Sequence, residues 1–572
     1  MPELSHPFST LTCDLLVIGS GAAGLSAAVS AAWQGLRVIV VEKDPVLGGA
    51  SAWSGGWMWI PCNPLAKRAG IIEDPAEPRR YLQHELGERF DPARVEAFLK
   101  AGPEMVAFFE QRTALQFADG NGIADIHGDS PGAGVGGRSV IAAPISAYSL
   151  GKLLPRLRRT MRETAVLGMP IMAGADLAAF LSVTRSWRSA LHVARRLSAH
   201  LLGMALKGRA THLVNGVALI ARLAKSAEDL GVVLWPSAPA TRLIQRGDRV
   251  AGAEVATAKG KVHVHARRGV VLAAGGFPHD QARRQATFPR APRNGDHLPL
   301  PPPAANGDGL RLGESVGAVV ADDLASPAAW CPVSRVPYPD GSHGHFPHII
   351  DRGKPGIFGV LANGERFVNE AGGYYDYAKA MVEQAPGTDV VSWLICDHAF
   401  LRRYGLGIAR PFPFPVEPAL RSGYLKTGAT IGELARNCGI DPEGLERTLS
   451  TWNLHARRGE DPQFGRGHSL YNRKQGDPRH SPNPCVAPLE QPPFYAVEVR
   501  PGSFGTFAGL KTDASARVLN ASGVPIPGLY AAGADMASIM GGFYPAGGIN
   551  LGPAMTFGYI AGRHAAGLSD NC

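Results

Sequence analysis

Residues 14–42 read DLLVIGSGAAGLSAAVSAAWQGLRVIVVE, and this stretch decides the fold of the N-terminal part of the chain. The apolar runs 14–18 and 36–41 predict two buried strands, and the Ala-rich run between them predicts a helix. A glycine-rich turn precedes the helix, and Glu42 follows the second strand, eighteen residues after Gly24. This order of strand, turn, helix, strand and acid is the βαβ unit that binds a dinucleotide.

The glycines of the turn GSGAAG, residues 19–24, allow the backbone to approach a pyrophosphate at the helix N-terminus. The Glu42 carboxylate would accept hydrogen bonds from the ribose hydroxyls of an adenosine and would repel a phosphorylated ribose. Three further glycine-rich segments favour FAD over NAD: GGASAWSGG (48–56), VVLAAGGF (270–277) and PGLYAAGAD (527–535). In a two-lobed FAD fold the first βαβ unit binds the adenosine, and such returning strands bind the ribityl chain and the flavin.

The cofactor-binding residues that this interpretation predicts are distributed over several segments of the chain. Asp535 would bind a hydroxyl on the ribityl or pyrophosphate side, because a carboxylate accepts hydrogen bonds from hydroxyls. The full predicted set is Gly19, Gly21, Ala22, Ala23, Gly24, Glu42, Lys43, Gly49, Ala50, Ser51, Ser54, Gly55, Gly56, Ala274, Gly275, Gly533, Asp535, Asn550 and Leu551.

The 572 residues divide into a cofactor-binding part and an insertion. Residues 1–285 and 488–572 contain the glycine-rich segments and are predicted to form the first and second parts of one FAD-binding domain. Residues 286–487 are rich in Pro and Gly with short mixed elements, which predicts an inserted α+β substrate or capping domain. The fold class is therefore α/β: a two-lobed Rossmann-like FAD-binding domain with an inserted capping domain.

The net charge of +9 is concentrated in one stretch, because residues 151–215 contain eleven Lys and Arg but two acids. Leu, Met and Trp recur there at helical spacing, which predicts a basic amphipathic helical excursion. Such an excursion either packs as a solvated face on the main body or lies peripherally on an anionic membrane surface. The apolar run 165–183 contains Pro170 and Asp176, which argues against a membrane-spanning helix. No nucleic-acid module accompanies the charge, so nucleic acid is not an expected partner.

The cysteines form no CxxC pair, so the sequence predicts neither a metal site nor a disulfide framework. They are Cys13, Cys62, Cys331, Cys396, Cys438, Cys485 and Cys572. The N-terminal residues MPELSHPFST lack a basic region followed by an apolar run and are not a signal peptide. A cytoplasmic location is therefore expected, and the inner membrane surface is the alternative that the basic excursion leaves open.

The C-terminal segment YPAGG, residues 544–548, predicts the chemistry. The phenol O–H of Tyr544 and the backbone N–H of Gly548 can both donate to one carbonyl oxygen, just before a predicted helix start. Two such donors stabilise the enolate-like charge that forms when an α-proton leaves a ketone, as an oxyanion hole does. Together with a flavin, which accepts a hydride, this pair predicts the oxidation of a ketone.

These segments together resemble the fumarate reductase/succinate dehydrogenase flavoprotein superfamily across nearly the whole chain and, within it, the FAD-dependent 3-ketosteroid Δ1-dehydrogenases. The motifs that carry the resemblance are GGASAWSGG (48–56), KPGIFGVLANGERFVNEAGGYYD (354–376), GTFAGLKTD (505–513), PGLYAAG (527–533) and YPAGGINLGPAMTFGYIAG (544–562). The resemblance implies that Tyr544 and Gly548 polarise the C3 ketone of a steroid. A second tyrosine then removes the α-proton, and the β-hydride goes to the flavin.

Counting five residues past Asn369 places the implied base at Tyr374, with Tyr375 and Tyr377 as alternatives. A phenol with a pKa of about 10 is a weak base at neutral pH, so its neighbours must favour the phenolate. The single GxGxxG motif is assigned to FAD, so the sequence offers no second motif for a nicotinamide cofactor. The resemblance implies that an external acceptor such as a quinone reoxidises the flavin.

Two departures from the superfamily pattern narrow the cofactor and the substrate. Members with covalent flavin carry a His after the ribose acid, where residues 51–54 of this chain read SAWS, so non-covalent FAD is implied. Dicarboxylate-reducing members use an Arg and a His where this chain reads GGINLG (547–552) and GTFAGL (505–510). A dicarboxylate would lack its charge partners, so succinate and fumarate are not expected substrates.

A third departure lies at residues 125–128, where the family has a DYYP-like run with an assisting tyrosine and this chain reads DIHG. Ile126 and His127 replace the two aromatic residues, and His127 is either a proton relay or a loop histidine. The substrate stays open between a 3-ketosteroid desaturated at Δ1, a Δ4(5α)-type ketosteroid and a monocyclic, cyclohexanone-like ketone. An alternative of another class is a flavoprotein that binds flavin or transfers electrons without dehydrogenating a substrate; the polarising pair argues against it.

Overall fold

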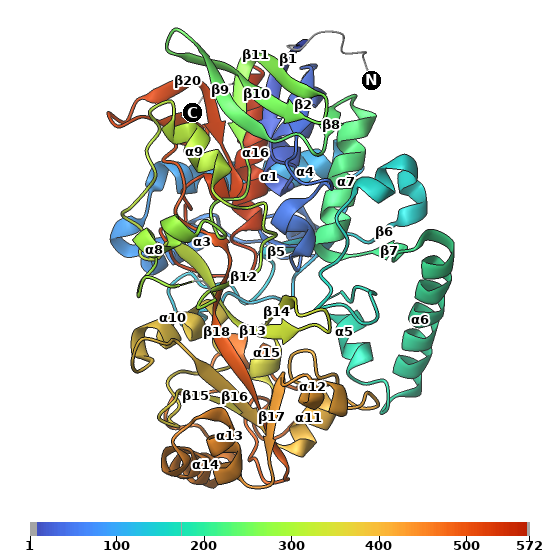
Figure 1. Cartoon of the computed structure of the whole chain (residues 1–572), viewed down its shortest axis with the longest axis vertical. Coiled ribbons are helices and arrows are strands. Elements are labelled where there is room, and N and C mark those ends of the chain that lie inside the picture. Colours follow the sequence, from blue (N-terminus) through green and yellow to red (C-terminus); the bar gives the residue numbers. More distant parts are fainter. Residues whose placement is uncertain (1–8, 173, 294, 569–572) are drawn as a thin grey trace.

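Two β-sheets, one above the other along the long axis, organise the computed structural model (Figure 1). It describes residues 9–172, 174–293 and 295–568, so Cys572 and most of the N-terminal segment MPELSHPFST lie outside the described residues. The upper sheet in Figure 1 is built from both ends of the chain, and the lower sheet mainly from its middle.

The eight-stranded upper sheet has the predicted βαβ unit at its centre. Its strands are β1 Ser9–Ile18, β2 Val38–Val41, β8 Val233–Trp235, β9 Ala240–Arg246, β10 Arg249–Thr257, β11 Gly260–Leu272, β19 Arg517–Leu519 and β20 Pro525–Ala531. Helix α1, Ala22–Trp33, connects β1 to β2. The strand order is β19-β20-β11-β1-β2-β8, with β10 paired to β11 and to β9. β1 pairs in parallel with both β2 and β11. The paired segments 15–18, 38–41 and 270–272 are continuously apolar and buried because helices cover the sheet.

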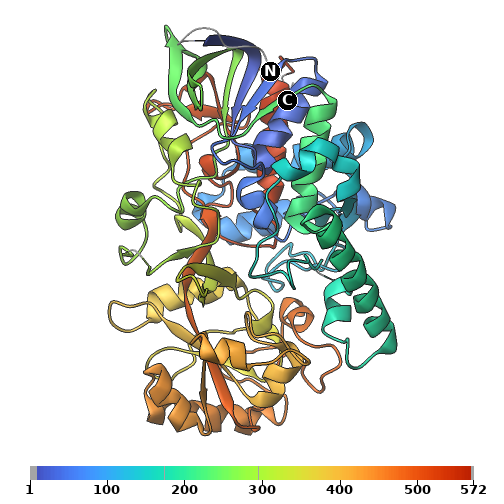
Figure 2. The ribbon, with the colours of Figure 1, turned by 45° about the vertical axis from the view of Figure 1, so that its right-hand side comes forward.

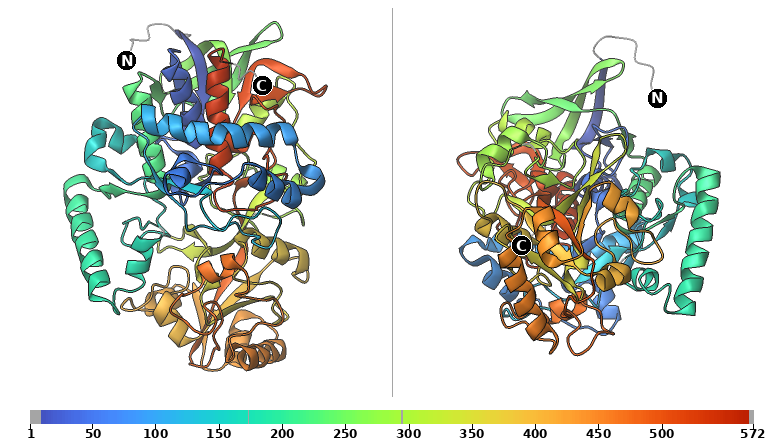
Figure 3. Two further views of the ribbon diagram at one scale, coloured as in Figure 1. Left: turned by 180° about the vertical axis from the view of Figure 1, so that it is seen from behind. Right: turned by 60° about the horizontal axis from the view of Figure 1, so that its bottom comes forward.

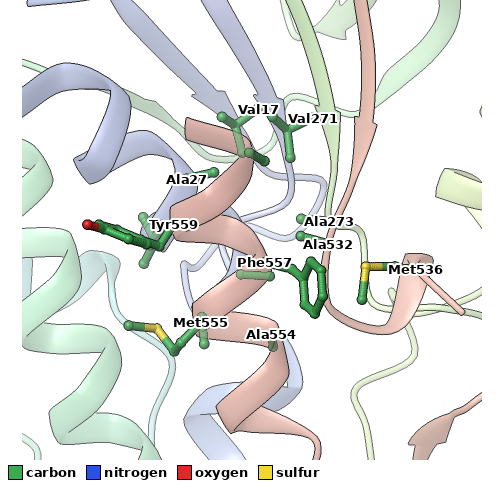
Figure 4. Close-up of a cluster of buried hydrophobic side chains, with 14 of the residues drawn as sticks. Val17, Ala27, Val271, Ala273, Ala532, Met536, Ala554, Met555, Phe557 and Tyr559 are labelled. Atoms are coloured by element: carbon green, nitrogen blue, oxygen red, sulfur yellow. The ribbon is translucent and has the colours of Figure 1, made fainter. Parts of the chain in front are cut away.

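Helices α4 (Pro92–Arg112), α7 (Asn215–Asp229) and α16 (Leu551–Ala565) pack around α1. Seen from behind, α4 crosses α16 at a steep angle (Figure 3, left). Figure 4 shows apolar side chains of α16: Phe557 points toward the segment after β20, and Tyr559 points to the opposite side, where its ring contacts Phe108 of α4. A Cβ atom on Gly558 would lie 2.3 Å from Ala23 O, so the absence of a side chain lets α16 approach α1 closely. This contact places the segment before α16 next to the glycine-rich turn.

The seven-stranded lower sheet has β18, Phe494–Thr506, as its long central strand. Its other strands are β12 Leu298–Pro299, β13 Ala328–Pro337, β14 His343–Pro347, β15 Ile357–Val360, β16 Ser392–Cys396 and β17 Leu425–Gly428. β13, β16 and β17 all pair antiparallel with β18. Residues 488–572, which the sequence predicts to be part of the FAD-binding domain, include β18. This strand pairs with strands of the predicted capping domain 286–487. The boundary at residue 488 is therefore corrected: β18 belongs to the lower sheet and connects it to the upper one.

Short helices and one small sheet complete the two parts. The lower part contains α10 Tyr374–Gln384, α11 His398–Tyr404, α12 Glu417–Arg421, α13 Ile431–Cys438, α14 Pro442–Ala456 and α15 Leu470–Gln475. The upper part contains α2 Pro64–Arg68, α3 Ala76–Leu86, α8 Gln281–Thr287, α9 Asp308–Glu314 and the sheet of β3 Trp57–Trp59, β4 Phe117–Asp119 and β5 Ser139–Ala142.

The basic stretch 151–215 forms an excursion along one side of the molecule. It leaves and rejoins the main body at the paired strands β6 (Ile145–Ser146) and β7 (His212–Leu213). Its regular elements are η3 Ala147–Arg156, α5 Ala175–Phe180 and α6 Trp187–Lys207. Helix α6 stands apart from both sheets (Figures 1 and 2).

The outer side of α6 is apolar as well as basic. Trp187, Leu191, Leu201, Leu202 and Leu206 are each more than half exposed. Within the described residues, no helix is both long enough and apolar enough to cross a bilayer.

Candidate active site

A cavity of about 920 Å³ lies between the upper and lower parts and is lined by segments of both. Every predicted cofactor-binding residue lines it except Gly24 and Asp535. The predicted catalytic residues Tyr544, Gly548 and Tyr374 also line it, whereas His127 is not part of the lining. The fold therefore brings segments from both ends and the middle of the chain to one site.

At one end of the cavity, the side chains are arranged to hold an adenosine and a pyrophosphate. The Glu42 carboxylate is buried and accepts hydrogen bonds from Ser20 N at 3.0 Å and Ser20 Oγ at 2.6 Å. Ser51 Oγ accepts from Ala22 N, the first residue of α1, at 3.0 Å. Lys43 Nζ donates to Asp308 at 2.5 Å, which fixes the loop next to Glu42. A carboxylate has about four acceptor positions, so Glu42 keeps capacity for ribose hydroxyls. These groups fit FAD.

Gly24 and Asp535 do not line the cavity but contact glycine-rich segments that do. A Cβ on Gly24 would lie 2.0 Å from Gly19 O, so this glycine permits the close packing of α1 on the turn. Asp535 is fully buried, and its carboxylate oxygens accept from the backbone N–H groups of Ala274 at 2.5 Å and Gly276 at 2.9 Å. Asp535 thus supports a glycine loop, and its contact with a cofactor hydroxyl stays a prediction. Burial raises the pKa of Asp535 to about 6.

Tyr544 and Gly548 lie on the loop that reaches the cavity directly before α16. Tyr544 is 5% exposed, and Asn550 Nδ2 donates to its hydroxyl at 3.3 Å. Gly548 has a φ of +99°, and a Cβ there would lie 2.7 Å from Trp59 N, so glycine is required. The Gly548 carbonyl accepts from Trp59 N at 3.1 Å, while its N–H has no acceptor among the described residues. This N–H is available to a ligand oxygen in the cavity.

The loop that carries Tyr544 and Gly548 is fixed from both parts of the molecule. The carbonyl oxygen of Pro545 accepts from Tyr81 Oη at 2.7 Å and from Ile126 N at 3.0 Å. On the other side, Tyr375 Oη of α10 donates to Gly542 O at 2.8 Å. The two candidate donors, Tyr544 and Gly548, therefore lie on a loop whose backbone three hydrogen bonds restrain.

Of the three candidate bases, Tyr374 is the one that lines the cavity. The Tyr375 hydroxyl donates to Gly542 O on the loop before α16. The Tyr377 hydroxyl lies 3.0 Å from Ser392 Oγ in the core of the lower part. The Tyr374 and Tyr544 rings meet edge to face, with centroids 5.0 Å apart. Burial, and next the neighbouring Tyr544 phenol, raise the pKa of Tyr374 well above its ordinary value. Tyr374 is therefore a neutral phenol at pH 7 before any substrate binds.

His127 lies beside the site, at the contact between the upper part and α10. Its Nε2 is 3.1 Å from Asp376 Oδ2 on α10, and its Nδ1 binds Glu85 on α3. Burial alone would lower the pKa of His127, but the hydrogen bonds to Asp376 and Glu85 outweigh it and raise the pKa to about 10. At neutral pH His127 is an imidazolium between two carboxylates.

Sequence reasoning missed the apolar wall on the far side of the cavity. The excursion contributes Met161, Val166, Leu177, Phe180, Leu181, Val193 and Leu197, and the loop after α11 contributes Pro411, Phe412, Pro413 and Phe414. The signal was present in the apolar run 165–183, which was weighed as a membrane segment rather than as a cavity wall. The mouth of the cavity is apolar too: Leu167, Phe412, Phe414 and Ile350 are 66%, 54%, 39% and 37% exposed.

The chain matches the family described as FAD binding domain over residues 14–551. It is 38% identical to the 4-oxocyclohex-2-ene-1-carboxylate 5-dehydrogenase of Sinomonas cyclohexanicum, over 98% of this chain and 95% of that protein. It is 35% identical to the 3-oxosteroid 1-dehydrogenase of Mycobacterium tuberculosis, over 97% of this chain and 98% of that protein. Among solved structures, it is similar to the 3-ketosteroid Δ1-dehydrogenase of Sterolibacterium denitrificans in complex with 1,4-androstadiene-3,17-dione. The TM-score is 0.90 and the identity 34%, over 97% of this chain and 99% of that chain.

The similarity extends over the full length of both polypeptides, so it includes the FAD-binding part, the capping part and the cavity between them. It confirms the family and the two-lobed fold with a capping domain that the sequence motifs predicted. The chain therefore belongs to the FAD-binding family that includes the 3-oxosteroid 1-dehydrogenases, and it is an FAD-dependent oxidoreductase.

Proposed function

We propose that this oxidoreductase desaturates a hydrophobic cyclic 3-ketone, in the first place a 3-ketosteroid, at Δ1. The observation that carries the proposal is the meeting of Tyr544, Gly548 and Tyr374 on one cavity with a long apolar wall. The wall suits a polycyclic, apolar substrate, and the two donors suit its ketone.

In the proposed reaction, the Tyr544 O–H and the Gly548 N–H donate to the ketone oxygen and stabilise the charge that develops there. The neighbouring C–H becomes acidic, and the Tyr374 phenolate accepts that proton. Bound FAD supplies the acceptor for the hydride that leaves the β-carbon. The substrate loses one proton and one hydride, and an α,β-unsaturated ketone results. Because Tyr374 starts as a neutral phenol of raised pKa, the reaction should accelerate toward alkaline pH.

The Tyr544→Phe and Tyr374→Phe variants are each expected to reduce flavin about 10²–10³-fold more slowly than the wild type, because each loses a group that acts in the transition state. The measurement is the loss of oxidised-flavin absorbance after anaerobic mixing with androst-4-ene-3,17-dione. The wild-type rate should rise with pH above 7, and this rise should vanish in Tyr374→Phe.

The matched control for this experiment is Tyr377→Phe, which removes a buried phenol O–H from the core of the lower part. Its rate should stay within a few-fold of the wild type. A wild-type rate in Tyr374→Phe or Tyr544→Phe would contradict the assigned roles. Mass analysis of the product distinguishes Δ1 from Δ4 desaturation.

A monocyclic ketone is the second candidate substrate, and two observations favour it. A relative at 38% identity acts on 4-oxocyclohex-2-ene-1-carboxylate, and Ile126 and His127 replace the aromatic pair of the ketosteroid enzymes. Flavin reduction by cyclohexanone-like ketones but not by steroids would keep the mechanism and change the substrate. If no ketone reduces the flavin, the result would favour a flavoprotein that binds flavin or transfers electrons without dehydrogenating a substrate.

We further propose that FAD is held without a covalent bond, because residues 51–54 of the segment after Glu42 contain no histidine. Precipitation of the holoprotein with trichloroacetic acid should release the yellow flavin into the supernatant, with less than about a tenth left in the pellet. Flavin that stays with the precipitated protein after washing would contradict this proposal.

For reoxidation we propose an external quinone, taken up at a membrane surface through the excursion 151–215. Its exposed apolar side chains lie next to arginines, and the cavity mouth beside it is also apolar. Basic residues attract anionic lipids, and apolar residues insert among the acyl chains. The site of action would then be the inner surface of the cytoplasmic membrane.

The triple variant Arg185→Glu, Arg188→Glu and Arg195→Glu should reduce sedimentation with phosphatidylglycerol vesicles at least about tenfold, at roughly 1 kcal/mol per cation. Arg196 is left unchanged because it pairs with Asp176 at 3.3 Å inside the excursion. The same charge change at Arg447, Arg457 and Arg458, exposed residues of the α14 region, is the control and should have little effect. Unchanged sedimentation of the first variant would refute membrane contact.

For His127 we propose a positioning role in place of the proton relay. Both of its ring nitrogens are bound to carboxylates, and it does not line the cavity. The Glu85–His127–Asp376 chain holds the start of α10, and therefore Tyr374, against the upper part of the molecule.

The His127→Gln variant should lower the free energy of unfolding by about 1 kcal/mol at pH 6, a value discounted for the partly exposed side chain. Because the folded-state pKa is raised to about 10, the stabilisation is fully present below the unfolded pKa of about 6.5 and is lost as pH rises through 10. Urea unfolding at pH 6, 8 and 10 should show the variant and the wild type converge. His84→Gln, an exposed histidine on α3, is the control; a difference for His127→Gln that is constant with pH would contradict the ionic role.

A further inference from the structure

Arg410 is a cation on the wall of the cavity that has no counter-charge. It lies on the loop between α11 and α12 and lines the cavity with its neighbours Pro411 and Phe412. Its Nη2 donates to Glu163 O at 2.8 Å and to Ala165 O at 3.0 Å. Among the described residues, no carboxylate pairs with Arg410, and neither Nε nor Nη1 makes a hydrogen bond.

Glu163, the acid whose backbone Arg410 contacts, does not pair its carboxylate with this guanidinium. Glu163 offers Arg410 its backbone carbonyl, but its side chain accepts from Tyr338 Oη at 2.5 Å. Burial lowers the pKa of Arg410, and the neighbour that opposes this effect is the Tyr424 phenol rather than a carboxylate.

Two other arginines of this chain, Arg366 and Arg222, have each of their three nitrogens hydrogen-bonded. Arg366 pairs with Glu370 and Asp461, each at 2.8 Å. Arg222 has no acidic partner, yet each of its three nitrogens donates to a backbone carbonyl at 2.7 Å. Burial of a charge is costly unless it is paired and hydrogen-bonded. Arg410, with two nitrogens left over, differs from both patterns.

The remaining charged groups of the cavity do not compensate Arg410. Lys43 pairs with Asp308 at the cofactor end. Asp351 accepts from His348 Nδ1 at 2.7 Å. Lys354 Nζ donates to two backbone carbonyls, and its strongest charged neighbour is Asp477. The uncompensated positive charge is therefore local to Arg410.

Arg410 also lies toward the open end of the cavity rather than at the ketone site. Phe412, two residues away, lines the same cavity and is 54% exposed, whereas Tyr544 is 5% exposed. The surrounding wall is apolar, and a charge-assisted hydrogen bond is stronger there than in water.

We infer that Arg410 binds a carboxylate carried by the substrate, so that the preferred substrate is an anionic cyclic ketone, an oxo acid. The inference rests on the proposed function, in which Tyr544 and Gly548 hold the ketone of the same molecule. The carboxylate has two chemical sources: a carboxyl group directly on a cyclohexanone ring, or one at the end of a steroid side chain. The distance from the ketone donors to Arg410 selects between them.

The experiment compares each acid with its methyl ester, which has the same ring system without the charge. The short pair is 4-oxocyclohexanecarboxylate and its methyl ester; the long pair is a 3-oxosteroid with a side-chain carboxylate and its methyl ester. The holoenzyme should prefer one acid over its ester in kcat/KM. Arg410→Met should reduce that acid-to-ester ratio about 10–100-fold, the value of a hydrogen bond to a charged group. Arg410→Lys should retain part of the preference.

Arg421→Met is the matched control, because Arg421 is an exposed arginine at the end of α12 outside the cavity lining, and its ratio should equal that of the wild type. A ratio that Arg410→Met leaves unchanged for both pairs would overturn the inference. An equal loss for acid and ester would also overturn it, because Arg410 would then only tie the loop to residues 163–165.

Binding is measured separately, by titration of the flavin absorbance shift with each acid and ester. If no ketone is turned over, the proposed function fails, but the acid-to-ester ratio of dissociation constants still tests Arg410. A ratio of one in the wild type for both pairs would refute the carboxylate subsite.

Discussion

The carbonyl oxygen of Pro545 is the point on which the site depends. It accepts hydrogen bonds from the Tyr81 side chain and from the Ile126 backbone, both in the upper part of the molecule. Tyr544 precedes this residue and Gly548 follows it at three positions, so these bonds restrain the loop that carries both candidate donors. If the two groups polarise a ketone as proposed, they must converge without reorganisation, and this restraint would serve that requirement.

The second half of the site is attached to the same loop from the opposite side. Tyr375 of α10 donates to Gly542, and this bond directs its neighbour Tyr374 into the cavity. The β18 strand explains why these two parts meet at all, because it is the central strand of the lower sheet and leads back to the upper one. The boundary between the two parts therefore depends on the long strand β18. The candidate site depends on the restrained loop between Gly542 and α16.

Local patterns in the sequence were sufficient for much of this structure. The strand–turn–helix of residues 14–42 depends on neighbours in the chain and lies where it was predicted. Tyr544 and Gly548 of the YPAGG segment line the cavity, and their role as donors stays a prediction. The partners of Asp535 in the folded chain were not predictable in this way. Ala274 and Gly276, whose N–H groups donate to its carboxylate, are about 260 residues away, and only the folded chain brings them together.

The same limit applies to β18 and to the tyrosines of α10. Three aromatic residues within four positions carry no sequence signal that says which one faces a cavity. The fold of α10 gives each tyrosine its own surroundings. The Tyr377 hydroxyl lies in the core of the lower part, the Tyr375 hydroxyl donates to Gly542, and Tyr374 lines the cavity. In the same way, Pro170 and Asp176 argued against a membrane-spanning helix in the apolar run 165–183, but only the fold shows that this run lines the cavity.

Residues 125–128, where this chain departs from the family pattern, make structural contacts on both sides of the site. Ile126 supports Pro545 through its backbone N–H, which any residue except proline would provide. Its buried side chain lies where a Cβ on Gly373 would be 3.0 Å away, so it packs against the start of α10. His127 adds an ionic contact to Asp376 on the same helix turn. The segment thus still holds the loop and α10 together, although the phenol of the ketosteroid enzymes is absent. In the proposed reaction, Tyr374 would then remove the proton without the assisting tyrosine that the family resemblance implies.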